Sequence, residues 1–370
     1  MIPPVKTVFI IGPTATGKTM LGVQLAHRFN GEIVSADSRQ VYRGLDIGTG
    51  KDLDEYTQVD PPIQYHLIDV ADPNDEYNVH RFSIDAQTAI TDINARNHLP
   101  VVVGGTPLYV KALIEDYELE GGPPDPELRK QLKGLDRGQL IDKLQEIAPD
   151  RLDKTDLTQR PRIIRAIEIA ATTGLVPVAP TIQADAPRTS SSACVPASPG
   201  NAGSQTKISN QPPKFNVQRS TFNVQCSTFI APLLIAPYYP RKTVHERIEK
   251  RLDQRLENGM IEEVESLHQQ GVSWERLEYL GLEYRYIALY LQEKLTRQEL
   301  RDQLLVKIRR FCKAQDVWYR KFERDGWDIH WIPEGEVQTA AELVDAFVHD
   351  RHIPIPKIRL DNITYGPRSQ

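Results

Sequence analysis

An eight-residue loop at residues 12–19 constrains this chain more than any other feature. Its sequence, GPTATGKT, is a complete G-x-x-x-x-G-K-[ST] phosphate-binding motif. An apolar run at residues 8–11 precedes it, and a helical pattern at residues 20–29 follows it. This order of strand, loop and helix is the context that such a loop requires, so we predict that the chain binds a diphosphate or triphosphate. The loop consists of Gly12, Pro13, Thr14, Ala15, Thr16, Gly17, Lys18 and Thr19.

Several positions in the loop have a physical role in holding phosphate. Gly12 and Gly17 let the backbone turn so that successive N–H groups can point at phosphate oxygens. The next helix adds the positive end of its dipole, Lys18 adds a mobile charge, and the Thr19 hydroxyl is placed to ligate Mg²⁺. A chance glycine turn is the alternative, and the flanking strand and helix disfavour it. The loop does not identify the phosphate, because kinases, NTPases and pyrophosphate-releasing enzymes all use it.

The composition indicates a globular chain with no strong bias. At 370 residues it is long enough for two domains or for one domain with a large insertion, and its net charge of -5 shows no basic excess. Cys194, Cys226 and Cys312 are scattered and form no C-x-x-C pair, so neither a disulfide framework nor a zinc site is expected. The sequence has no leader-like N-terminus and no apolar run of membrane-spanning length. We expect a cytoplasmic, monomeric protein without a membrane partner.

Alternating apolar runs and helical patterns in the first 120 residues predict an α/β fold. The order implies a P-loop NTPase-like, doubly wound parallel sheet, with ligands bound at the carboxyl ends of the strands. Runs that are apolar at every position suit strands covered on both faces. The expected strands are 7–11, 32–35, 66–70 and 101–103, and the expected helices are 18–29, 79–97 and 106–117.

The middle of the chain interrupts this pattern. A Gly- and Pro-rich segment at 121–126 leads into a small helical insertion, which we assign to residues 121–174. Residues 175–230 are rich in Pro, Ser, Ala, Gln and Asn and include a tandem heptamer, FNVQRST followed by FNVQCST. Such a segment buries too little apolar surface to offset its ordering entropy, so we expect a disordered low-complexity insert.

Order is expected to resume at residue 231 and to complete the catalytic core at residue 332. The predicted elements are a strand at 232–236, helices at 242–271, 278–292 and 296–324, and a last strand at 328–332. In the last of these helices an apolar stripe is predicted to face the core, and a basic stripe is either an RNA-facing ridge or simply solvated. Residues 333–370 form a C-terminal tail with one weak helix. The apolar stripe comprises Leu304, Ile308, Phe311, Gln315, Trp318 and Phe322, and the basic stripe comprises Arg309, Lys313, Arg320 and Arg324.

Two further motifs follow predicted strands and carry polar side chains. Asp37, in the segment at residues 35–42, either ligates Mg²⁺ or accepts a proton from a nucleophile, or it merely caps the next helix. Thr106, after the glycines of the segment at 104–109, either donates a hydrogen bond to a leaving oxygen or is a helix cap before a proline. The residues alone leave these alternatives open.

The three motifs, in this order, closely resemble the tRNA dimethylallyltransferase family. The segments that carry the resemblance are GPTATGKT, SADSRQVYRGLDIGTGK at 35–51, HLIDV at 66–70 and GGTPLYVKALI at 104–114. The block at 35–51 is the specific part, since a phosphate loop alone does not separate this family from kinases. The tRNA-facing signatures depart further from the family pattern, as at Gly281-Leu282, where the family has Gly-Tyr.

The resemblance implies transfer of a dimethylallyl group from dimethylallyl diphosphate to N6 of the adenosine 3′ of the tRNA anticodon. Loop residues 14–19 would bind the diphosphate, with Mg²⁺ as cofactor at Thr19, and Arg241 would neutralise charge on the leaving pyrophosphate. Asp37 would be the general base, and Thr106 would bond the bridging oxygen. The resemblance further implies that the base of the anticodon loop is contacted by Ser38, Arg39 and Gln40 and its phosphates by Arg162 and Arg165 of the insertion.

Three other functions remain open on the sequence. A small-molecule kinase would share the loop and the sheet, although the block at 35–51 argues against it. A diverged paralogue could instead prenylate a free adenine nucleotide, or bind RNA without catalysis.

Overall fold

The computed structural model describes residues 4–115, 125–172 and 230–362, and it divides the chain into two units. The first unit combines Met1–Tyr117 with Arg219–Gln370, and the second is Glu118–Gln218. Residues 175–229 of the predicted low-complexity insert, the Gly- and Pro-rich start of the insertion at 121–124 and the last eight residues of the tail lie outside the described residues. Ile230, predicted as the last residue of that insert, instead begins a strand. Among the described helices, none has the length and hydropathy to cross a bilayer.

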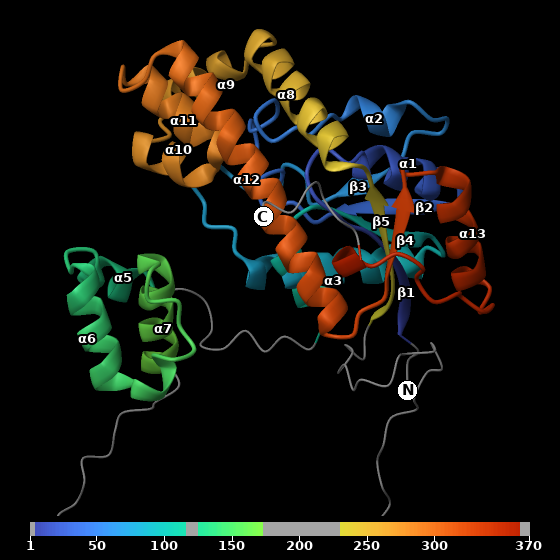
Figure 1. The fold of residues 1–370 in the computed structure, drawn as a ribbon, viewed down its shortest axis with the longest axis horizontal. Coiled ribbons are helices and arrows are strands. Elements are labelled where there is room, and N and C mark those ends of the chain that lie inside the picture. Colours follow the sequence, from blue (N-terminus) through green and yellow to red (C-terminus); the bar gives the residue numbers. More distant parts are fainter. Residues whose placement is uncertain (1–3, 116–124, 173–229, 363–370) are drawn as a thin grey trace, which may run out of the picture. The chain divides into compact units, whose positions relative to one another are not determined.

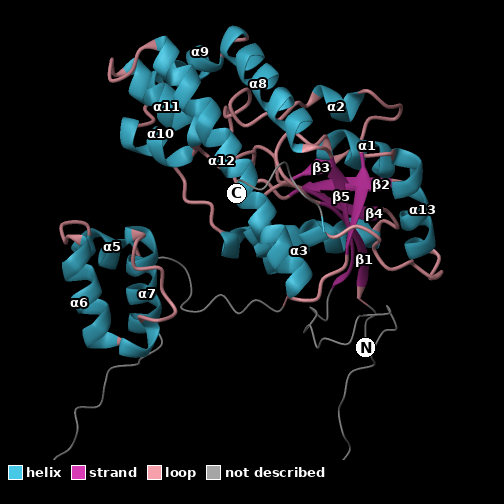
Figure 2. Cartoon of the chain, viewed as in Figure 1, coloured by secondary structure: helices cyan, strands magenta, loops and turns pink. Residues whose placement is uncertain are grey.

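A six-stranded, all-parallel sheet forms the first unit's centre and confirms the predicted α/β class (Figure 2). The strand order β3-β2-β4-β1-β5-β6 places β1, which leads into the phosphate loop, between β4 and β5. Consecutive residues of β1 are fully buried on both sides of the sheet, as expected for strands covered by helices. The strands are β1 Val5–Ile10, β2 Gly31–Ser35, β3 Tyr65–His66, β4 Leu99–Val103, β5 Ile230–Tyr238 and β6 Ile329–Pro333.

Alternate strand residues build two separate apolar layers. Val8 and Ile10 of β1 pack with α1 (Lys18–Arg28) and α13 (Val337–Val348). Phe9 points to the other face, which is covered by α3, α4 and the long helix α12 (Figure 1). The helices of this face are α3 Val79–Ala95, α4 Pro107–Ile114 and α12 Arg297–Arg324. The short helix α2 spans Asp54–Thr57.

The helices after β5 are more divided than the sequence predicted. The helix expected at 242–271 is broken at Gly259, where φ is 96°, and the helix expected at 278–292 is broken at Gly281, where φ is 156°. Both values lie in a region that glycine adopts far more readily than other residues. The resulting helices are α8 Arg241–Glu257, α9 Met260–Gln269, α10 Trp274–Leu280 and α11 Leu282–Leu291.

Two other sequence-based predictions were wrong in detail. The strand expected at 66–70 ends at His66, because Leu67 and Asp69 have φ values of 62° and 58° and leave the extended conformation. In α12, Phe311 does not face the core as its stripe predicted but is 48% exposed. The helix itself was correctly placed, and its start is fixed by a capping box between Thr296 and Glu299.

The second unit is a small helical body with a core of its own. Helices α5 Pro126–Leu132, α6 Arg137–Ile147 and α7 Arg160–Thr172 bury a shared set of aliphatic side chains, including Leu140 and Ile163. Glu168 of α7 is only 2% exposed and accepts hydrogen bonds from Arg129, at 2.6 Å, and from Arg165, at 3.2 Å. The two remaining short turns of 3₁₀ helix are η1 Pro149–Arg151 in this unit and η2 Leu360–Asn362 in the first unit.

A buried carboxylate stabilises the sheet at β2. Glu32, 2% exposed, accepts hydrogen bonds from Arg96, His66 and His98. Burial by itself would raise the pKa of the Glu32 carboxyl, but these hydrogen bonds outweigh it and hold the pKa below its usual value of 4.5.

We therefore expect Glu32→Gln to lower the free energy of unfolding by about 2 kcal/mol at pH 7, because the buried side chain loses the charge on which its hydrogen bonds from Arg96 and the two histidines depend. A depressed pKa contributes stability above the unfolded-state value, so the difference between the proteins should shrink as pH falls below 4.5. Urea denaturation at pH 7 and pH 4 measures both effects. Asp92→Asn is the matched control, because Asp92 binds the same arginine from a side chain that is 62% exposed. Equal stability of wild type and Glu32→Gln at pH 7 would contradict the assignment.

Candidate active site

The phosphate loop lies between β1 and α1, where the motif predicted it. Its glycines have the positive φ values that the turn needs, 136° at Gly12 and 76° at Gly17. Lys18 Nζ donates to the carbonyl oxygen of Pro13 at 2.6 Å, and Thr16 Oγ1 donates to the same oxygen at 2.9 Å. The lysine is therefore held inside the loop that it would use to bind phosphate.

Buried positive charge is concentrated at this loop. Burial and the neighbouring Arg251 lower the pKa of Lys18 to about 8, and burial and Arg255 lower the pKa of Arg251 to about 10. Arg251 Nη2 donates to Thr14 Oγ1 at 2.6 Å. Arg255 Nη2 is buried without a hydrogen bond, and Asp52 lies 3.7 Å from it. Cations whose charged forms are disfavoured in this way gain most from an incoming anion, so the site is suited to a diphosphate.

A cavity of about 300 Å³ joins the loop to the other two motifs. Its walls come from the phosphate loop, from residues 37–40 after β2, from residues 103–106 after β4 and from the C-terminal helices. The structure thus brings together most of the first unit's predicted site residues at the carboxyl edge of the sheet. Those that line this cavity are Thr14, Ala15, Gly17, Lys18, Thr19, Asp37, Ser38, Arg39, Gln40 and Thr106.

Asp37 and Thr106 are each held by a hydrogen bond from a backbone N–H, and each keeps polar capacity for a substrate. Asp37 Oδ1 accepts from the backbone N–H of Arg39 at 2.8 Å, so this carboxylate caps a turn and no helix follows it. Thr106 precedes α4 as its N-cap residue, but its side chain makes no capping bond and accepts instead from Ser38 N at 3.1 Å. Thr106 thus occupies the cap position before a proline, as the capping alternative has it, but its side chain ties the second motif to the third.

Gln315 of α12 is a site residue that sequence reasoning misread as a core position. It is 3% exposed, its Oε1 accepts from Thr14 N at 2.9 Å, and its Nε2 donates to Gly105 O at 2.6 Å. One turn later, Tyr319 Oη donates to Gly12 O at 3.3 Å. Helix α12 thereby joins the phosphate loop to the loop after β4. A polar residue within an apolar stripe was the signal that could have revealed this role.

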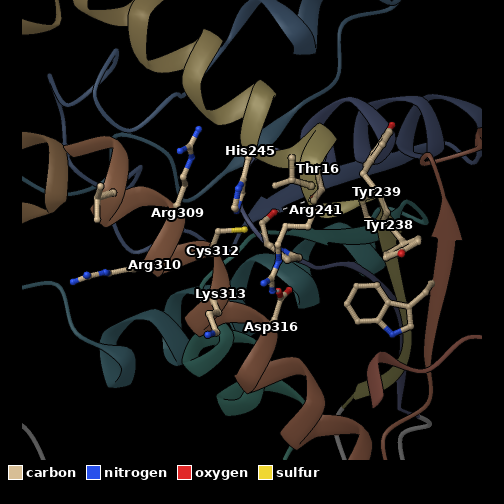
Figure 3. A pocket seen from close by; sticks show the side chains of 15 residues that line it. Thr16, Tyr238, Tyr239, Arg241, His245, Arg309, Arg310, Cys312, Lys313 and Asp316 are labelled. Carbon is tan, nitrogen blue, oxygen red and sulfur yellow. Dashed lines mark hydrogen bonds and ion pairs between the residues drawn. The ribbon is translucent and has the colours of Figure 1, made fainter. Parts of the chain in front are cut away.

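Arg241 lines a different cavity, of about 230 Å³, on the side of the loop formed by Pro13 and Thr16 (Figure 3). Its guanidinium faces Asp316 at 3.9 Å. Burial raises the pKa of Asp316 to about 6, even though Arg320 and Arg241 lower it. The two cavities have no lining residue in common. Adjacent residues of the phosphate loop nevertheless line different cavities, since Pro13 lines the second and Thr14 the first. Three predicted donor-site residues line this second cavity: Pro13, Thr16 and Arg241. Gly12 lines neither cavity.

The predicted RNA-facing arginines have protein partners in the structure. Arg162, whose side chain is 64% exposed, lies 3.0 Å from Asp156, and Arg165 pairs with the buried Glu168. Both belong to the second unit. In the basic stripe of α12, Arg309 pairs with Glu249 at 2.8 Å, and Arg320 lies 3.6 Å from Asp361.

Five charged residues of the first cavity were not found from sequence: Asp52, Glu55, Arg251, Arg255 and Glu283. Burial raises the pKa of Glu283, with Arg255 and Arg251 acting against it. Residues 241–257 contain many charges of both signs, so nothing in the local pattern distinguishes the arginines that turn inward. Their role depends on where α8 crosses the sheet edge.

Comparison with known proteins identifies the family of this chain. A family model described as IPP transferase matches residues 40–322, and one described as isopentenyl transferase matches residues 5–60. The chain is 41% identical to tRNA dimethylallyltransferase 2 of Citrifermentans bemidjiense, covering 92% of this chain and 95% of the relative. It is 43% identical to tRNA dimethylallyltransferase 2 of Treponema denticola, covering 88% and 95%.

Solved structures give the same result for the fold. The tRNA isopentenylpyrophosphate transferase of Bacillus halodurans superposes with a TM-score of 0.60 at 28% identity, covering 93% of this chain and 97% of that one. A eukaryotic dimethylallyltransferase acting on tRNA superposes with a TM-score of 0.67 at 21% identity, covering 96% and 82%, and this second likeness concerns the fold alone.

The buried cations lead to a prediction about anion binding. We expect Arg251→Met to weaken the binding of inorganic pyrophosphate roughly 10- to 100-fold, because a charge-assisted hydrogen bond in a buried site is lost. Isothermal titration calorimetry measures the change. The matched control is Lys250→Met, which removes an exposed positive charge from the adjacent position of the same helix. Unchanged affinity of the Arg251 variant would show that the anion lies elsewhere.

Proposed function

Because the chain belongs to the tRNA dimethylallyltransferase family, we propose that it transfers a dimethylallyl group from dimethylallyl diphosphate to N6 of the adenosine 3′ of the tRNA anticodon, releasing pyrophosphate. The observation that carries this proposal is a single cavity lined by the phosphate loop with Lys18, by the arginines of α8, and by Asp37 and Thr106. A diphosphate binder and a candidate general base therefore line one space.

The donor's diphosphate would bind the loop amides, Lys18 and Arg251. These groups bear charge or dipoles that stabilise negative charge, and that charge grows as the carbon–oxygen bond to pyrophosphate breaks. An exocyclic amine is a weak nucleophile, so stabilisation of the leaving group must supply much of the catalysis. Arg241, near the loop's other side, would lower the energy of the released pyrophosphate.

A Mg²⁺ ion fits the loop as a cofactor held mainly by the substrate. The described parts of the chain contain no cluster of three His, Cys, Asp or Glu side chains suited to a metal. Thr19 Oγ1 together with phosphate oxygens and water is the donor set that Mg²⁺ commonly accepts. When bound, the ion would add positive charge beside the diphosphate.

Asp37 and Thr106 would act on the reacting atoms. N6 of adenine attacks the first carbon of the dimethylallyl group, the bond from that carbon to the bridging oxygen breaks, and the N6 proton passes to the Asp37 carboxylate. The hydrogen of Thr106 Oγ1 is directed only to Ser38 Oγ at 3.4 Å, so it is free to turn to the bridging oxygen.

The acceptor adenine would unstack from its neighbouring bases in the anticodon loop and enter the cavity, because an enzyme that modifies a base must hold that base in a pocket. Ser38, Arg39 and Gln40 would contact the extruded adenine. We assign tRNA-phosphate contacts to Arg162 and Arg165 of the helical insertion, which would exchange their carboxylate partners for the RNA backbone. We propose that the protein carries out this reaction in the cytoplasm as a monomer.

Asp37→Asn is expected to lower kcat by roughly two to four orders of magnitude, the usual contribution of general acid–base catalysis, and to leave pyrophosphate affinity unchanged. Asp54→Asn is the control, because Asp54 is exposed on α2 and does not line the cavity. Single-turnover transfer and calorimetry separate the two effects. An active Asp37 variant would remove this residue from the mechanism.

The function itself is tested by incubating the full chain with labelled dimethylallyl diphosphate and unmodified tRNA, with and without Mg²⁺. Label recovered as N6-isopentenyladenosine at the position 3′ of the anticodon is the expected result. Label transferred to free adenine nucleotides but not to tRNA would refute tRNA as the acceptor. Phosphate release from ATP with no prenyl transfer would refute the proposed reaction.

A further inference from the structure

One carboxylate outside the cavity holds a stretch of its wall. Glu263 Oε1 accepts from Gly48 N at 3.1 Å and from Tyr284 Oη at 2.6 Å, and Oε2 accepts from Asp46 N at 2.9 Å and from Ile47 N at 2.6 Å. Four donors on two oxygens nearly fill a carboxylate's accepting capacity. Glu263 thus links α9, α11 and the loop at residues 46–50.

The loop that Glu263 binds forms part of the cavity wall. Gly48, Thr49 and Gly50 line it, as does Tyr284. Gly50 O accepts from Gln40 Nε2 at 3.0 Å, so the loop also orients a residue proposed to contact the adenine. The backbone lies tightly on the tyrosine, because a Cβ on Gly48 would come within 2.7 Å of the Tyr284 ring.

The far end of the loop has its own anchor. Lys51 is 2% exposed, donates to Tyr42 O at 2.8 Å, and pairs with Asp46 and Asp69. The lysine fixes where the loop ends, whereas Glu263 fixes the amides at its start and middle. Without the glutamate, three consecutive N–H groups would lose their acceptor.

We propose that Glu263 is a positioning residue for the acceptor base, acting through the loop at residues 46–50 and Gln40. It does not line the cavity and therefore acts on substrate only through these groups. The donor's diphosphate would be held by Lys18 and Arg251, whereas the amides of residues 46–48 already donate to Glu263. This proposal rests on the function proposed above and predicts an effect on the tRNA side of the reaction alone.

The test compares Glu263→Gln with Glu262→Gln, which alters an exposed carboxylate one residue earlier on α9. A glutamine places an NH₂ group against N–H donors and loses about half of the hydrogen bonds. We expect KM for tRNA to rise roughly tenfold or more, while pyrophosphate affinity stays within about twofold and amide hydrogen exchange of residues 46–48 accelerates. Tyr284→Phe, which removes one of the four bonds, should shift KM in the same direction by less.

Two results would overturn the proposal: unchanged exchange protection of residues 46–48 in Glu263→Gln, or an equal loss of pyrophosphate and tRNA affinity. Should Glu263→Gln not fold, Tyr284→Phe decides by the same readouts. If the wild-type chain fails to modify tRNA, the proposed function falls, whereas the exchange measurement still decides whether Glu263 orders the loop.

Discussion

Positive charge concentrated at the phosphate loop is the constraint on which the site depends. Lys18 and Arg251 lie near one another, and the pKa of each is lowered by burial and by a neighbouring arginine. Such a cluster is costly in the free protein and becomes favourable when an anion enters. The surrounding framework therefore has to be rigid, and the fully buried strands on either side of β1 supply that rigidity.

Rigid connections between chain segments distant in sequence explain how three short motifs become one site. Gln315 joins two strand-end loops through its amide, and Thr106 joins the second motif to the third. Each link uses a buried or half-buried polar group with a specific partner. Losing either partner would leave a polar atom without a hydrogen bond, which favours a single arrangement of the walls.

The sequence was sufficient for the parts of the structure that local pattern determines. The phosphate loop and α12 follow from motif, periodicity and capping. The breaks at Gly259 and Gly281 were missed because a helix tolerates an isolated glycine, so a glycine inside a helical pattern does not by itself mark an end. Arg251 and Gln315 were missed as site residues because their function comes from tertiary contacts, which no periodicity encodes. The separation of Arg241 from the main cavity has the same origin.

The self-contained core of the helical insertion determines which of its residues can be substituted freely. Its helices bury their own aliphatic core and neutralise Glu168 with their own arginines. Substitutions on its exposed face therefore leave this internal packing and the charge balance at Glu168 intact.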